Sequence, residues 1–139
     1  MFKDIVTPRF GDVDGLGHIN NTVLAAWFEI GRNHYFRLFT PDLDLSHDKW
    51  VLIMAHTDYD FLKEMFFGEN VEIRSYIGRI GTKSFTVYQE AWQRGQLCVK
   101  GNAVVVHYDF INKVSTPIPN DIKEELKKYL VDPETLHSK

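Results

Sequence analysis

A glycine-rich loop at residues 10–21 carries the side chains of this sequence best suited to chemistry. It reads FGDVDGLGHINN, with two aspartates, a histidine and two asparagines among three glycines. An apolar run with near-helical spacing follows directly, and Asn20 or Asn21 is a good N-cap for the helix that this run predicts. The unpaired N–H groups at a helix start carry the positive end of its dipole, so they can hold a carbonyl oxygen as it becomes anionic. We therefore expect a carboxylate to lie beside an oxyanion-binding helix start.

Two interpretations of Asp14 follow from its place in this loop. It is either a structural residue that caps a turn, as aspartates in such loops commonly are, or a nucleophile or general base that acts on an activated acyl carbon. Asp12 is expected to be structural. His18 is more readily a hydrogen-bonding loop residue than a catalytic one, because its neighbours Gly17 and Ile19 offer no group to orient its ring.

Several other kinds of site are disfavoured by spacing. The six histidines show no metal-binding pattern, and Leu16 and Val23 stand where a calcium loop would need oxygen ligands. The glycines form neither a P-loop nor a dinucleotide fingerprint, and no Gly-x-Ser-x-Gly elbow occurs. We expect no metal and no cofactor.

Composition sets the broad class of the protein. A chain of 139 residues, 44% hydrophobic and 14% aromatic, predicts one domain over residues 1–139 with a substantial core. A net charge of −3 without a basic block argues against nucleic acid or an anionic membrane as the partner. A single cysteine, Cys98, and no apolar leader or membrane-length run favour a cytoplasmic location.

The hydrophobic period predicts the elements that must position the loop. We expect strands at residues 2–10, 51–61, 71–77, 84–88 and 96–110, a long helix at 22–38 and a short helix from Asn120. The long helix is apolar over more than one stripe, so we expect it to be covered on most sides, and Glu29 and Arg32 are spaced to pair across one turn. A twisted antiparallel sheet wrapped round this helix would be an α+β fold.

The loop and the helix after it carry a pattern that resembles a known family. The pattern is Asp12-x-Asp14-x-x-Gly17-His18-x-Asn20-Asn21, followed by Trp27-Phe28-Glu29-x-x-Arg32. It resembles the hotdog-fold acyl-CoA thioesterases of the 4-hydroxybenzoyl-CoA thioesterase and YbgC-like group, and the segments from Tyr59 to Gly68 and from Arg79 to Phe85 fit as well. The resemblance implies a five-stranded antiparallel sheet wrapped around one long central helix, with a short C-terminal helix.

The resemblance also implies roles for particular residues. The catalytic carboxylate falls on Asp14, the backbone N–H that polarises the thioester carbonyl falls on Asn21, and His18 joins the catalytic set. Residues assigned to substrate or CoA are Gly17, Asn20, Tyr59, Arg79, Lys83 and Ser84. The alternative interpretation of Arg79 and Lys83 is a solvated hairpin tip.

The function implied is hydrolysis of an acyl-CoA thioester by a homodimer, or a dimer of dimers, with interfacial active sites. Two alternatives remain: a hotdog hydratase or dehydratase of enoyl thioesters, and a non-catalytic acyl-CoA-binding protein. The acyl group, the choice between CoA and acyl carrier protein, and the choice between nucleophile and base for Asp14 are left open by the sequence.

Overall fold

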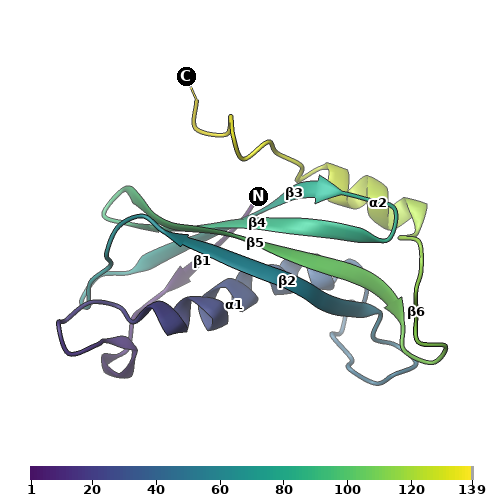
Figure 1. Cartoon of the computed structure of the whole chain (residues 1–139), viewed down its shortest axis with the longest axis horizontal. Helices are drawn as coiled ribbons and strands as arrows, with labels where there is room; N and C mark the ends of the chain where they lie inside the picture. Colours follow the sequence, from purple (N-terminus) through teal and green to yellow (C-terminus); the bar gives the residue numbers. More distant parts are fainter. Residues whose placement is uncertain (139) are drawn as a thin grey trace.

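The computed structural model describes residues 1–138 and shows an antiparallel sheet curled along a long helix (Figure 1). The strands are β1 Phe2–Val6, β2 Leu52–Phe61, β3 Val71–Ile80, β4 Ser84–Gln93, β5 Gln96–Asp109 and β6 Val114–Ser115. The sheet order is β1-β3-β4-β5-β2, and the short β6 pairs with β5. The expected sheet of five main strands is confirmed, and β6 is an addition to it.

The long helix α1, Leu24–Phe36, lies in the hollow of the sheet (Figure 1). The short helix α2, Asn120–Lys127, contacts β3. The face of α1 that meets the sheet is buried, whereas Ala25, Ala26, Glu29 and Ile30 on the other face are exposed. The expectation that this helix is covered on most sides is therefore wrong for a single chain, because a curled sheet contacts only one face. Within residues 1–138, neither helix has the length and apolar character needed to cross a bilayer.

Element boundaries differ from the sequence prediction where pairing decides them. β1 stops at Val6, because Pro8 has no N–H to donate to a ladder, and the chain then makes a 3₁₀ turn at Phe10–Asp12. α1 is shorter than residues 22–38, since a 3₁₀ turn at Asn21–Val23 precedes it. β3 is longer than expected because it continues to pair with β4 past a β-bulge between Ile77 and Arg79. β4 is longer than expected because its residues 89–92 pair with residues 72–75 of β3.

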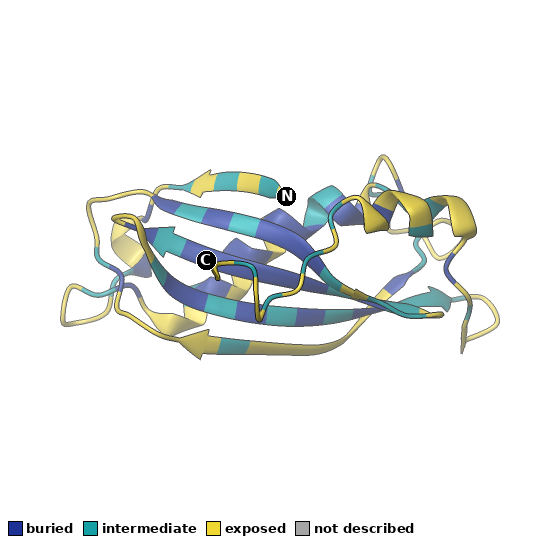
Figure 2. Cartoon of the chain, turned by 90° about the horizontal axis from the view of Figure 1, so that it is seen from above, coloured by how far each residue is buried: buried dark blue, intermediate teal, exposed yellow. Residues whose placement is uncertain are grey.

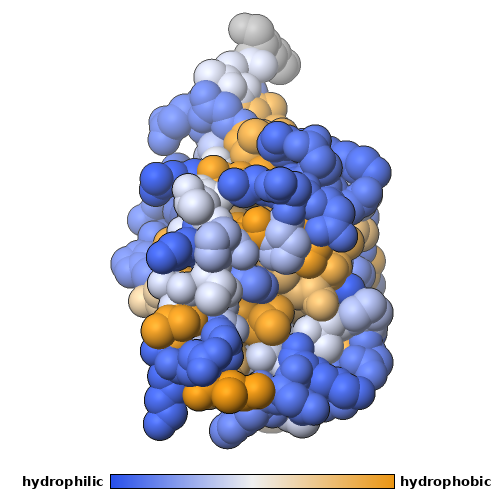
Figure 3. Space-filling model, turned by 90° about the vertical axis from the view of Figure 1, so that its right-hand side faces the viewer, coloured by the Kyte–Doolittle hydropathy of each residue, from blue (hydrophilic) through white to orange (hydrophobic). Residues whose placement is uncertain are grey.

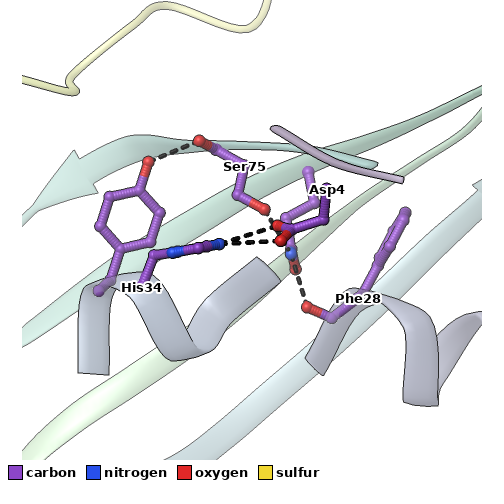
Figure 4. A network of polar contacts seen from close by, with 6 residues as sticks. Asp4, Phe28, His34 and Ser75 are labelled. Carbon is purple, nitrogen blue, oxygen red and sulfur yellow. Dashed lines mark hydrogen bonds and ion pairs between the residues drawn. The ribbon is translucent and has the colours of Figure 1, made fainter. Parts of the chain in front are cut away.

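A buried polar network fixes α1 against the sheet (Figure 4). The Nε2 group of Gln89 on β4 donates to the backbone oxygen of Phe28 at 2.7 Å and to the Ser75 hydroxyl at 2.9 Å. The Tyr35 hydroxyl donates to the backbone oxygen of Ser75 at 2.6 Å. Because buried polar groups are costly when unpaired, this set of partners holds the helix in one position along the sheet.

The two charged side chains expected to pair on α1 do not do so. Arg32 is turned into the core, where its Nη1 group donates to Gln89 Oε1 at 3.3 Å and its Nε atom has no partner among residues 1–138. The expected Glu29–Arg32 pair is therefore wrong. A side-chain hydrogen bond instead joins the helix to the sheet edge, since His34 Nε2 lies 3.0 Å from the Asp4 carboxylate on β1 (Figure 4).

The closest approach of α1 to the sheet is at Gly31, and it yields a test of this packing. A Cβ atom there would lie 2.1 Å from Ser75 Oγ and 2.8 Å from Gln89 Nε2. Gly31→Ala gains about 1 kcal/mol of helix propensity but overpacks the core, which costs about 1–3 kcal/mol and breaks the network as well. We therefore expect lower stability in urea unfolding. Gly11→Ala, at a site with open space around it, should leave stability within about 0.5 kcal/mol; equal stability of the two variants would contradict the packing argument.

Candidate functional site

A pocket of about 420 Å³ lies between the glycine-rich loop, the start of the helical region and the segment that follows β2. The loop contributes Asp14, His18, Asn20 and Asn21 to its wall, and the segment after β2 contributes Lys63 and Glu64. Apolar side chains, among them Ile19 and Met65, complete the lining. The tertiary structure thus brings the carboxylate and the helix start expected from the sequence to one cavity.

The loop folds around the Asp14 carboxylate. Asp14 Oδ1 accepts the backbone N–H groups of Leu16 at 2.8 Å and His18 at 3.2 Å, and the Asp14 N–H donates to the His18 oxygen at 2.8 Å. Gly17 allows this turn because it adopts a φ of 81°, which side chains disfavour. Asp14 Oδ2 has no hydrogen-bond partner within residues 1–138, so one oxygen shapes the loop and the other is unpaired.

The start of the helical region presents an unpaired backbone donor. Asn20 is the N-cap, since its side-chain oxygen accepts from the Thr22 N–H at 3.1 Å and from the Thr22 hydroxyl at 3.0 Å. Asn21 lines the pocket, and its backbone N–H has no acceptor among the described residues. A helix start with a free N–H is suited to bind an oxygen that carries negative charge.

Asp12 stabilises the loop through contacts at its start, as expected for a structural residue. Its buried carboxylate accepts the Arg9 backbone N–H at 2.8 Å and the Arg9 guanidinium at 3.1 Å. The hydrogen bond from the Arg9 side chain is the main cause that holds the pKa of Asp12 below its usual value. The backbone oxygen of Asp12 accepts the Asn20 N–H at 2.8 Å, which ties the start of the loop to the helix cap.

Glu64 is a pocket residue that the sequence did not reveal. Its carboxylate lies 3.3 Å from His18 Nδ1, and the His18 ring also meets the Phe66 ring edge-on at 5.1 Å. The backbone joins the same two segments, since the Ile19 N–H donates to the Met65 oxygen at 2.7 Å. The orienting partner of His18 therefore comes from another part of the chain. The only sequence signal for it is the charged pair Lys63-Glu64 directly after a strand.

Of the other residues assigned to substrate, Tyr59 stacks at 6.2 Å on the pocket residue Phe61 without lining the pocket, and Arg79, Lys83 and Ser84 lie away from it. Tyr59 packs its ring on Phe28 at 5.6 Å beside the core. Arg79, Lys83 and Ser84 sit at the β3–β4 hairpin, at the opposite end of the sheet (Figure 1). From Val99 on the pocket wall to Val106, the partner of Ser84, β5 runs for roughly 23 Å at about 3.3 Å per residue. One chain does not bring these groups together.

The curled sheet, the long helix packed in its hollow and the pocket at the helix start are those of a thioesterase of the hotdog fold. The chain belongs to the thioesterase-like superfamily, whose family model matches residues 8–126. No three His, Cys, Asp or Glu side chains within residues 1–138 are grouped so that they could hold a metal ion.

Solved structures of thioesterases agree with this assignment, and one curated relative is similar in sequence. A predicted thioesterase from Bacillus stearothermophilus is 39% identical, with a TM-score of 0.89 over 95% of this chain and 98% of that one. A thioesterase from Thermus thermophilus, complexed with coenzyme A and zinc, is 26% identical, with a TM-score of 0.78 over 90% and 96% of the two chains. The uncharacterised protein YsmA of Bacillus subtilis strain 168 is 28% identical over 107 residues, which are 76% of this chain and 71% of YsmA.

The lowered pKa of Asp12 predicts how stability depends on pH. A depressed carboxyl pKa contributes stability above the ordinary value near 3.9, and this contribution is lost as the pH falls through the folded-state value. Asp12→Asn should therefore lower the free energy of unfolding by about 1–2 kcal/mol at pH 7, and the difference from wild type should shrink below about pH 4. Asp48→Asn, an exposed control, should show neither effect in urea titrations. A gap that stays constant with pH would exclude the charge as its source.

Proposed function

We propose that this protein hydrolyses acyl-CoA thioesters to the free acid and CoA. The observation that carries the proposal is that Asp14 and Asn21 line one pocket, with the Asn21 N–H lacking an acceptor among residues 1–138. The thioesterase class of the fold and the coenzyme A in the Thermus thermophilus relative support a CoA thioester as the substrate.

In the proposed reaction, the thioester carbonyl oxygen accepts a hydrogen bond from the Asn21 N–H. Asp14 Oδ2 removes a proton from a water molecule, which attacks the carbonyl carbon, and the negative oxygen that forms is stabilised at the helix start. The tetrahedral intermediate then breaks its carbon–sulfur bond and releases the CoA thiolate. A thiolate is a good leaving group, so this pocket needs little general-acid help.

Asp14 can also act as a nucleophile within the same geometry. Its carboxylate would form a mixed anhydride with the acyl group as the thiolate leaves, and water would then hydrolyse that anhydride. Heavy-oxygen water in a single turnover distinguishes the routes, because label that appears in the Asp14 side chain requires the anhydride.

We propose that the enzyme acts as a dimer joined through β2. This strand is a ten-residue edge of the sheet, almost wholly exposed (Figure 2), and it displays Ile53, Met54 and Phe61. A long open edge with apolar side chains is a surface that proteins cover, and pairing β2 with its copy across a two-fold axis does so.

Antiparallel self-pairing of β2 places opposite ends of the two sheets side by side. The Phe61 end of one copy, where the pocket lies, would then neighbour the Leu52 end of the other, on the side of the β3–β4 hairpin. Figure 3 looks onto that end, where hydrophobic surface lies among polar groups. The CoA part of a substrate in one pocket would thus extend toward the partner subunit's Arg79, the partner subunit's Lys83 and the partner subunit's Ser84.

A second candidate reaction is favoured by the contact between His18 and Glu64. A histidine oriented by a carboxylate is the arrangement expected of a hotdog hydratase or dehydratase acting on enoyl thioesters, and the 3.3 Å contact supplies one. Loss of enoyl absorbance without thiol release would identify this reaction. Ligand-induced stabilisation without either signal would identify a binding protein.

The charge of Asp14 is tested by Asp14→Asn. Asparagine keeps an Oδ1 atom for the two loop N–H groups, so the loop should stay folded while the charge and the base are lost. We expect turnover of an acyl-CoA panel, followed by free-thiol release, to fall by about 10²–10⁴-fold with the melting temperature nearly unchanged. The exposed control Asp121→Asn on α2 should keep full turnover. Activity retained by Asp14→Asn would move the chemistry to another group.

The dimer is tested by a charge on the β2 edge. Met54 is 40% exposed, so Met54→Lys should leave the fold of each subunit unchanged. In the dimer it would place one lysine from each subunit at the β2–β2 interface, where the two charges repel. We expect a smaller species in analytical ultracentrifugation and a parallel loss of thiol release. The control Ile5→Lys, 58% exposed on the opposite edge strand β1, should leave both unchanged. Met54→Lys protein that remains dimeric would refute this interface.

A further inference from the structure

The outer face of the sheet holds a fully buried carboxylate that the proposed reaction does not use. Glu90 on β4 accepts the Tyr88 hydroxyl at 2.8 Å and the Trp92 Nε1–H at 2.9 Å. Its third contact is His137, whose Nε2 lies 2.7 Å from Glu90 Oε2 and whose ring meets the Trp92 ring edge-on. A buried carboxylate with several donors is a strong attachment point, so it fixes the segment that carries His137 onto the sheet.

The same segment pairs with β3 through its backbone. The Ile77 N–H donates to the Tyr129 oxygen at 3.0 Å, and the Val131 N–H donates to the Ile77 oxygen at 2.8 Å. β1 does not pair with β3 at Ile77, because the pairing of these two strands ends with Phe2 opposite Ser75. Residues 129–137, here called the strap, therefore extend the edge of the sheet and then cross its outer face, as the yellow segment in Figure 1 shows.

The strap contacts β3 at its bulge. The pairing of β3 with β4 shifts register between Ile77 and Arg79, so Gly78 is the extra residue. Gly78 is closely packed, because an added Cβ atom would lie 3.2 Å from the Tyr88 Cβ and 3.6 Å from the Pro133 Cγ. Pro133 belongs to the strap, so the strap and β4 together enclose the bulge.

The bulge decides which way Arg79 points. Side chains alternate between the two faces of a strand, and one extra residue reverses every position after it. Ile77 is buried against the core, and Ile80 also packs on the core, whereas Arg79 is exposed. Regular alternation from Ile77 would turn Arg79 inward and Ile80 outward. The bulge therefore turns Arg79 outward, and the strap stabilises the bulge.

We propose that the strap is a positioning element for the β3–β4 hairpin, with His137 and the backbone of Val131 as its two attachments. By holding the bulge, it keeps Arg79 and the hairpin at residues 81–83 oriented for the CoA part of the substrate. The role in CoA binding rests on the proposed function, whereas the stabilisation of the hairpin by the strap does not.

Two variants of the full chain remove the two attachments separately. Val131→Pro deletes the N–H that donates to Ile77, at a position paired like a strand, and His137→Ala deletes the side chain on Glu90. In each, we expect amide hydrogen exchange at Ile77 and across residues 79–84 to become about tenfold faster, while the β2–β5 pairing is unaffected. Thr135→Ala, an exposed strap position, is the matched control and should exchange like wild type. Unchanged exchange in both folded variants would overturn the proposal.

Kinetics test the link to CoA. We expect KM for an acyl-CoA to rise about threefold to tenfold in both variants with kcat within about twofold, because uniform binding is lost rather than chemistry. Faster exchange with an unchanged KM, or a fall in kcat alone, would refute the positioning role. Should no acyl-CoA be hydrolysed even by wild type, the proposed function would fail, and the exchange measurement would still decide whether the strap holds the hairpin.

Discussion

The packing of α1 into the hollow of the sheet is the constraint on which the site depends. Gly31 allows the helix to approach the sheet closely, and Gln89 and Ser75 then hydrogen-bond to each other while binding the helix backbone and Tyr35. Because these groups are buried, sliding or lifting the helix would leave polar atoms unpaired. The position of the helix start, and with it the direction of the Asn21 N–H, therefore depends on contacts of residues that do not line the pocket.

In the proposed reaction, the glycine-rich loop would use the same residues for its own folding and for chemistry. One oxygen of Asp14 closes the turn, and the other has no partner within the described residues. Asp12, held by Arg9, ties the loop to the N-cap of the helical region, so the charged atom and the backbone donor keep their relative positions. A carboxylate whose orientation is already fixed loses little entropy when a substrate binds, which favours a rigid site with few catalytic groups.

One edge of the sheet is covered within the chain and the other is open. Beside β3, short β1 and then the strap occupy the edge, and Phe2 stacks on Tyr129 at 4.8 Å where the two meet. The other edge, β2, is long and open. In a single chain the pocket and the β3–β4 hairpin lie at opposite ends of the sheet. In the proposed dimer, an antiparallel copy on the open edge would bring them near each other.

The sequence alone determined the order of elements, the five main strands, the loop with Asp14 and a cap at Asn20 or Asn21, because alternation, turns and caps depend on residues close in the chain. Only the tertiary structure decided that Arg32 turns inward to Gln89, that Glu64 meets His18, that β3 bulges at Gly78, and that His137 lies on Glu90. Each of these depends on which strands pair and in what register. No local pattern encodes that choice, since it is made by burial over the whole sheet.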